Sequence, residues 1–514
     1  MAKEVYLHDI HKWALSPESF PNFKLSDFSN DINLTLEEDF AIDTTTTNTT
    51  LAHILIKRYL EKGSNLWFNN YLESKDLSLT ENYTFLPSKD NQNEIQLIDY
   101  DNGNNFKKFL DTLESLFNYG QIWNLSGLVE KKTLGQLVFP FGEGVLSEEY
   151  LQSEEQRDDI RSWIEKFMQM SDVRQKQFHE IYALLKRKGM IAELLFRSLE
   201  DSNVDFIEEY GEDVVLGDID DPEVIKMLQQ QEMMDVEEEE EEEEKVPELV
   251  KDNDNNNEKD LAGNQQHYLE SRLQYVSDSQ LITENKDAVM MKWEYKIMKL
   301  SADTLFSKTV PMKGFAPPNP DVVDVDDAVV NVLNIGFGMG IIDTYIQENI
   351  ETLSQKYPNK QFKHYIIEAH PDVLKQMETK GWFEKKNVVV LKGRWQDELM
   401  KLLDDNIFFN GIYYDTFSEH YKDMLELYDI IIGMIKYENG VFSFFNGLGS
   451  DCVFFYDIYK DLVKLDLFEK YGLKCEYKNM VVDTIDNSTW DGITKNYFDC
   501  PVFYHPMITF NHDM

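Results

Sequence analysis

Apolar residues in the C-terminal half of the chain form short runs that alternate with stretches of helical period. The runs predict strands at 362–368, 388–391, 408–414 and 440–445. The intervening and following stretches predict helices at 371–380, 395–403, 421–435 and 454–470. Two further strand-like runs, at 473–482 and 497–510, follow without a helix between them. This alternation predicts a doubly wound, Rossmann-like α/β sheet that ends in an antiparallel edge hairpin.

The first unit of this sheet is a strand, a tight glycine turn and a helix. A β-branched run at 329–335 meets the alternating glycines Gly336, Gly338 and Gly340, and apolar residues of helical spacing follow at once. Glycines are needed because the turn demands unusual backbone angles and because a cofactor must approach bare backbone. No phosphate-binding lysine follows them, which excludes a P-loop. The turn alone allows three interpretations: it could bind a nicotinamide dinucleotide, bind S-adenosylmethionine, or be a tight turn with no ligand.

The ends of the predicted strands carry the candidate site residues, because ligands of such sheets bind at the carboxyl ends of the strands. Glu368 ends the second strand, where a carboxylate can accept hydrogen bonds from both ribose hydroxyls of an adenosine. Trp395 and Gln396 follow the third strand and can flank an adenine ring, and Asp415 follows the fourth. Together with the edge hairpin, the short glycine turn favours S-adenosylmethionine and a class I methyltransferase.

The first 200 residues are predicted to form a mainly helical, non-catalytic interaction domain. Apolar residues recur at helical spacing within 51–62 and 106–117, and 157–188 predicts one long helix or two. Gly189 is read as a helix stop before a shorter helix at 190–199. Thr50 and His53 have the spacing of an ankyrin unit, but no 33-residue period recurs.

Negative charge is concentrated in one segment of the chain. The net charge of −45 argues against direct binding to nucleic acid, which needs a basic face, and fits a basic partner. Residues 201–260 hold 25 acidic against 4 basic side chains, including eight consecutive glutamates. We therefore expect 201–266 to be a disordered acidic linker, apart from a short helix at 223–234. A globular catalytic domain is expected over 267–514.

Composition also bears on the cellular location of the protein and on metal binding. No apolar run is long enough to span a membrane, and the first residues lack the pattern of a secretory signal. The three cysteines, Cys452, Cys475 and Cys500, are far apart and give no zinc spacing, so no metal site is expected. The expected location is the cytoplasm and the nucleus.

The segment at 287–298, just before the sheet, allows two interpretations. Taken alone, it predicts an amphipathic helix with methionine and tryptophan on the core face and Glu294 in solvent. The alternative is that Glu294 belongs to the site, and the wider pattern favours it.

From Tyr268 to the C-terminus the chain resembles the fungal protein-arginine δ-nitrogen (N5) methyltransferases and, more distantly, guanidinoacetate methyltransferase. Six ordered motifs carry the resemblance: 289–294, 334–343, 366–372, 393–397, 412–420 and 443–449. The resemblance implies a class I methyltransferase preceded by an ankyrin-like domain, with S-adenosylmethionine as cofactor. It also implies that Glu294 and Asp415 hold a guanidino group as the catalytic pair. The cofactor contacts that it implies fall on Tyr268, Met290, Met298, Gly336, Phe337, Gly338, Met339, Gly340, Ile341, Glu368, Ala369, His370, Trp395, Gln396 and Asp415.

Guanidinium chemistry agrees with such a pair. The group is a planar, delocalised cation whose nitrogens are poor nucleophiles. Two carboxylates can grip it, keep positive charge away from the attacking nitrogen and accept its proton. The resemblance implies monomethylation of the δ nitrogen of arginine, in a ribosomal protein of the large subunit. Alternatives are an ω-nitrogen arginine methyltransferase, a small-molecule guanidino methyltransferase, and a non-catalytic adaptor that binds basic partners.

Overall fold

The computed structural model describes most of the C-terminal half of the chain and parts of the N-terminal half. The described residues are 3–5, 7, 9–15, 51–61, 66–74, 77–79, 99–118, 126–127, 132–213, 265–277, 280–318, 328–417, 421–482, 490, 492–494 and 497–512. The chain divides into two compact units, Met1–Met190 with Ala262–Met514 and, separately, Ile191–Leu261.

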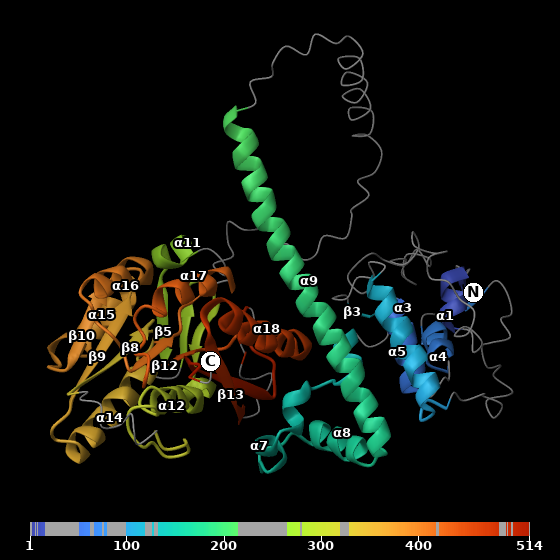
Figure 1. The fold of residues 1–514 in the computed structure, drawn as a ribbon, viewed down its shortest axis with the longest axis horizontal. Coiled ribbons are helices and arrows are strands. Elements are labelled where there is room, and N and C mark those ends of the chain that lie inside the picture. Colours follow the sequence, from blue (N-terminus) through green and yellow to red (C-terminus); the bar gives the residue numbers. More distant parts are fainter. Residues whose placement is uncertain are drawn as a thin grey trace, which may run out of the picture. The chain divides into compact units, whose positions relative to one another are not determined.

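A seven-stranded sheet forms the centre of the C-terminal part (Figure 1). Its strands are β8 (Val329–Ile335), β9 (Gln361–Glu368), β10 (Val388–Lys392), β11 (Gly411–Tyr414), β12 (Val441–Phe444), β13 (Leu473–Val481) and β14 (Val502–Phe510). Their order is β10-β9-β8-β11-β12-β14-β13, and β14 runs antiparallel to both of its neighbours. This confirms the predicted doubly wound sheet with an antiparallel edge, the class I methyltransferase arrangement. The strand order reverses between β8 and β11, which is where such sheets bind ligands.

Helices cover both faces of this sheet. One face carries α12 (Tyr295–Thr304), α14 (Ile341–Lys356) and α15 (Pro371–Thr379); the other carries α16 (Trp395–Asp404), α17 (Tyr421–Ile431) and α18 (Val453–Tyr471). A short 3₁₀ turn, η5 (Trp382–Glu384), precedes β10. Side chains of β8 alternate between the two cores: Val330 and Val332 join the first, and Leu333 and Ile335 the second. Burial on both faces explains why these strands read as continuous apolar runs.

A small antiparallel sheet precedes the large one. It follows α11 (Gln265–Glu270) and consists of β5 (Leu273–Ser277), β6 (Gln280–Thr283) and β7 (Ala288–Met291), with η4 (Lys292–Glu294) leading into α12. An amphipathic helix over 287–298 is therefore wrong for its first half. In β7, Met290 packs into the main core and Met291 packs with Trp490, and this two-sided burial favours a strand.

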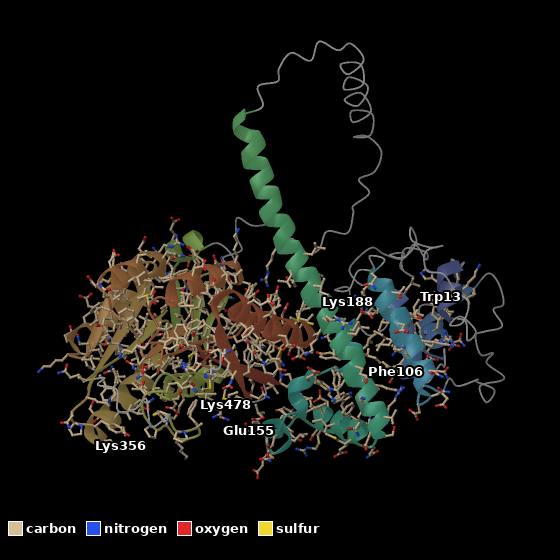
Figure 2. The ribbon with its side chains drawn as sticks, viewed as in Figure 1. Trp13, Phe106, Glu155, Lys188, Lys356 and Lys478 are labelled. Atoms are coloured by element: carbon tan, nitrogen blue, oxygen red, sulfur yellow. The ribbon has the colours of Figure 1, made fainter. Side chains whose placement is uncertain are left out.

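The N-terminal half contributes mainly short helices. Its described elements are β1 (Lys3–Val5), α1 (Asp9–Leu15), α3 (Leu51–Leu60), α4 (Leu66–Ser74), β2 (Leu77–Leu79), α5 (Gly103–Asn118), β3 (Ser126–Gly127), β4 (Lys132–Thr133), α6 (Leu134–Val138), η3 (Glu143–Leu146), α7 (Glu148–Leu151), α8 (Asp158–Met168) and α9 (Asp172–Asp213). The helices predicted at 51–62 and 106–117 correspond to α3 and α5. Lys188, labelled in Figure 2, joins α9 to α5 by donating to Asn118 Oδ1 at 2.8 Å. The ankyrin-like architecture stays a prediction.

Helix α9 continues through Gly189, so the helix stop predicted there is wrong. A glycine inside a helix costs only about 1 kcal/mol, which the packing of the preceding turns offsets. The domain boundary predicted at residue 200 falls inside this helix. Residues 214–264, with most of the expected acidic linker and the helix predicted at 223–234, lie outside the described residues. No helix in the described part of the chain is long and apolar enough to cross a membrane.

Residues 134–190 pack directly on the large sheet. Val145, Tyr150 and Ile160 share one apolar cluster with Tyr456 of α18 and Phe503 of β14. Beside this cluster, the buried carboxylate of Asp457 accepts hydrogen bonds from Tyr182 OH (2.7 Å), Tyr504 OH (2.5 Å) and Glu143 N–H (3.0 Å). At the surface, Glu155 forms an ion pair with Lys296 of α12 at 3.2 Å (Figure 2). This part of the N-terminal half therefore completes the core of the catalytic fold.

Candidate active site

The glycine turn between β8 and α14 has the backbone shape that its sequence predicts. Gly336 and Gly340 have φ angles of +93° and +74°, in the region that favours glycine. A Cβ atom at Gly336 would lie 2.0 Å from the backbone oxygen of Asp415. A Cβ atom at Gly340 would lie 2.3 Å from the ring of Phe337. Both glycines are therefore required by close packing as well as by backbone angle.

Buried polar side chains hold this turn in place through hydrogen bonds. Asn334 Nδ2 donates to the backbone oxygen of Gly336 at 2.8 Å and to both carboxylate oxygens of Asp343 at 3.0 Å. His364 Nε2 lies 3.1 Å from Asp343 Oδ1, and all three side chains are fully buried. The turn is thus fixed before any ligand binds.

Glu368 at the end of β9 supports the turn from the side. Its Oε2 accepts the N–H of Phe337 at 2.9 Å, and its Oε1 accepts the N–H of His370 at 2.6 Å. Burial raises the pKa of the Glu368 carboxyl, and these backbone donors oppose the shift. His370 caps α15, and its Nε2 lies 3.0 Å from the backbone oxygen of Tyr268. Glu368 therefore links the turn to the end of β9.

A cavity of about 360 Å³ opens at the carboxyl ends of the central strands. Ten predicted site residues line it: Tyr268, Met290, Glu294, Gly336, Gly338, Glu368, Ala369, Trp395, Gln396 and Asp415. The oxygens Gln396 Oε1 and Thr416 Oγ1 are buried and have no hydrogen-bond partner among the described residues. The cavity therefore offers polar groups for a ligand.

Six predicted contact residues lie outside this lining: Met298, Phe337, Met339, Gly340, Ile341 and His370. Phe337 packs its ring against Trp382, with a centroid distance of 5.2 Å. Met298 is fully buried, with its sulfur 3.8 Å from Tyr413 OH. Phe337 and Met298 belong to the apolar core that also contains Met290 of the cavity lining. As direct cofactor contacts, the six residues remain predictions.

Glu294 and Asp415, the predicted catalytic pair, meet at the cavity as buried acids. Glu294 is 3% exposed, and its Oε1 accepts the N–H of Met291 at 2.7 Å and the phenol OH of Tyr497. Burial and then the nearby charge of Asp415 raise the pKa of Glu294 to about 8, while both hydrogen bonds oppose the rise. The interpretation of Glu294 as a solvated helix residue is therefore wrong.

Asp415, unlike Glu294, has a fully buried carboxylate oxygen that lacks a hydrogen-bond partner among the described residues. This oxygen is Oδ2. Burial, followed by the charge of Asp343, raises the pKa of Asp415 to about 7. Two acids held in this way ionise most readily when a cation enters between them, because the cation offsets both the lost hydration and their repulsion. The pair is suited to a planar, positively charged ligand.

The comparisons with known proteins agree with this geometry. The family model of guanidinoacetate N-methyltransferase matches residues 324–474. The chain is similar to protein arginine N-methyltransferase 2 of Saccharomyces cerevisiae, with 37% identity over 90% of this chain and 91% of that protein. The protein of that name from Candida glabrata is 39% identical over 78% of this chain and 79% of its own. The Kluyveromyces lactis protein is 43% identical over 65% and 71%.

The chain belongs to the protein arginine N-methyltransferase 2 family. Membership of this family confirms the resemblance and the prediction of an enzyme, and it removes the non-catalytic adaptor as an alternative. It also confirms S-adenosylmethionine as the cofactor, in agreement with the class I sheet. The assignment of single residues to cofactor and substrate stays a prediction.

Tyr497 belongs to the candidate site of this arginine N-methyltransferase but is not among the residues predicted from the sequence. Tyr497 lines the cavity and donates to Glu294, although 203 residues separate the two in the chain. It lies in the connection between β13 and β14, whereas the strand predicted at 497–510 would have begun with it. An aromatic residue at that position carries no local signal, because only the folded chain brings it to Glu294.

Proposed function

We propose that this enzyme transfers one methyl group from S-adenosylmethionine to the δ nitrogen of arginine in a basic protein. The observation that carries the proposal is the pair of buried acids, Glu294 and Asp415, at the cavity beside the glycine turn. The δ position is supported by the match to guanidinoacetate N-methyltransferase. Guanidinoacetate and an arginine side chain both carry a guanidino group, which a pair of buried carboxylates can bind.

The residues present fit the cofactor. Gly336 and Gly338 offer bare backbone at the cavity, and Glu368 lies where a ribose can be bound. Trp395 and Gln396 line the part of the cavity that we assign to the adenine ring. When bound, S-adenosylmethionine supplies an electrophilic methyl group on a sulfonium.

The two acids act on the acceptor. Glu294 and Asp415 accept hydrogen bonds from the guanidinium and fix its plane. The nitrogen that gains the methyl group would lose a proton to Asp415 Oδ2, while the bond between the methyl carbon and the sulfonium breaks and S-adenosylhomocysteine leaves. Orientation supplies much of the acceleration, up to about 7–11 kcal/mol in well-aligned reactions.

A ribosomal protein of the large subunit is the proposed substrate, methylated in the cytoplasm or the nucleus. The net charge of −45 supports a basic partner, because opposite charges speed encounter. The test is incubation of the enzyme with labelled cofactor and purified large-subunit proteins, followed by fragmentation mass spectrometry of the methylated arginine. Product methylated at the δ nitrogen supports the proposal. Product methylated only at ω nitrogens, or only on small guanidino compounds, contradicts it and supports one of the two remaining alternatives.

A further inference from the structure

Tyr497 binds one oxygen of Glu294 and leaves the other available. Its phenol OH donates to Glu294 Oε1, and its ring lines the same cavity. The N–H of Met291 donates to that same oxygen at 2.7 Å. Because both hydrogen bonds use Oε1, the lone pairs of Oε2 remain for another donor.

The backbone of Tyr497 is anchored on the side of the large sheet. Ser450 Oγ donates to the backbone oxygen of Tyr497 at 2.7 Å, and the N–H of Asp499 donates to the backbone oxygen of Ser450 at 2.8 Å. A second anchor lies upstream, where Thr494 Oγ1 donates to the backbone oxygen of Asn285 at 2.8 Å. The connection between β13 and β14 thus reaches the β6–β7 hairpin and carries Tyr497 to Glu294.

Aromatic neighbours restrict the ring of Tyr497. Trp293 lies at a centroid distance of 5.7 Å with an interplanar angle of 34°, and Trp490 lies at 5.1 Å with an angle of 81°. Rings on two sides leave the phenol little freedom to rotate away from Glu294. The hydrogen-bond donor is therefore held in place before substrate binds.

We propose that Tyr497 is a positioning residue for methyl transfer, which fixes the Glu294 carboxylate so that Oε2 receives a hydrogen bond from the guanidinium of the substrate arginine. This inference rests on the proposed function. It adds a residue from the edge hairpin to the acceptor side of the site. The hydroxyl acts only through Glu294, so its loss weakens the reaction without removing a group that touches the reacting atoms.

The pH dependence distinguishes positioning from a merely structural role. The titratable groups that face Glu294 are Tyr497, Tyr413 of β11 and Asp415. Tyr497 donates to the carboxylate and so stabilises its ionised form. Without that donor the pKa of Glu294 rises, and a smaller fraction of it is ionised at a given pH.

The test is Tyr497→Phe, which removes the hydroxyl and keeps the ring. We expect kcat/KM for an arginine-containing peptide to fall about 10- to 100-fold near pH 7, the range for a lost hydrogen bond to a charged group. The acidic limb of the pH profile should move to higher pH, so that the loss shrinks at pH 9. Binding of S-adenosylmethionine, measured by calorimetry, should stay unchanged.

Tyr471→Phe is the matched control. Tyr471 OH donates to Asp429 Oδ1 at 2.6 Å, away from the cavity lining, and its loss should leave kcat/KM and the pH profile unchanged. Normal kcat/KM in Tyr497→Phe, or a loss of equal size at every pH, would overturn the inference. A wild-type enzyme that methylates no arginine would contradict the proposed function. In that case, calorimetry of free arginine binding over the same pH range tests the Tyr497–Glu294 pair separately.

Discussion

The two sides of the cavity are built in different ways. The turn side, defined by Gly336, Gly338 and Glu368, lies within a short stretch of chain and is shaped by backbone hydrogen bonds. The acid side, defined by Glu294, Asp415 and Tyr497, draws on three distant segments and keeps a buried carboxylate oxygen without a partner among the described residues. In the proposed function, a local motif binds the methyl donor, whereas side chains brought together by tertiary packing select the acceptor.

The largest expected effect is a loss of methyl transfer without a loss of cofactor binding when an acid of the acid side is replaced. Asp415→Asn keeps the shape of the side chain but removes the proton acceptor, so methyl transfer should fall about 10²- to 10⁴-fold. Glu294→Gln should cause a loss of the same kind. Cofactor affinity, measured by calorimetry, should change only a few-fold in both variants. Turnover within threefold of wild type in both would contradict the assignment of the acid side.

The next effect concerns the turn side. Gly336→Ala places a Cβ atom 2.0 Å from the backbone oxygen of Asp415, at a residue with positive φ. We expect a loss of about 2–4 kcal/mol in the free energy of unfolding and weaker cofactor binding. Gly103→Ala is the control, because a Cβ atom there meets nothing within 4 Å. Urea unfolding measures the stability. Unchanged stability in Gly336→Ala would contradict the prediction, because it would mean that the backbone of the turn shifts to accommodate the Cβ atom.

A third effect follows from the raised pKa values of the acid side. The pKa of Glu294 rises to about 8 and that of Asp415 to about 7 in the folded protein, so the fold holds their protons more tightly than the unfolded chain does. The ligand-free enzyme should therefore lose stability as the pH rises from about 4.5 to about 8. Glu294→Gln should flatten this slope and raise stability at pH 8 by at least about 1.4 kcal/mol, one pKa unit. Thermal unfolding across this pH range measures it, and a slope unchanged by the substitution would contradict it.

The smallest effect tests a contact away from both sides. Tyr182→Phe removes one of the hydrogen bonds to the buried carboxylate of Asp457. Tyr504 and the N–H of Glu143 still bind that carboxylate, so the loss should be about 1–2 kcal/mol in unfolding free energy. Activity at 25 °C should be normal. A large loss of activity at full stability would connect this contact to the site.

The sheet could be predicted from the sequence because its strands are buried on both faces and separated by amphipathic helices. The turn and the acids at the strand ends followed from the same pattern, since Glu368 and Asp415 directly follow buried runs. Three features did not follow. The strand β7 depends on pairing with β6, the continuity of α9 through Gly189 depends on packing, and Tyr497 depends on a contact over 203 residues. Each is decided by partners that are distant in the chain.

The contact between Tyr182 and Asp457 has a consequence during protein synthesis. The two residues are 275 positions apart, and ribosomes add about 5–20 residues per second, so roughly 14–55 s pass before Tyr182 can meet its acceptor. Throughout that interval Val145, Tyr150 and Ile160 lack the α18 and β14 surfaces that cover them in the finished protein. The nascent chain must therefore carry an incomplete apolar surface until nearly its last strand has been made.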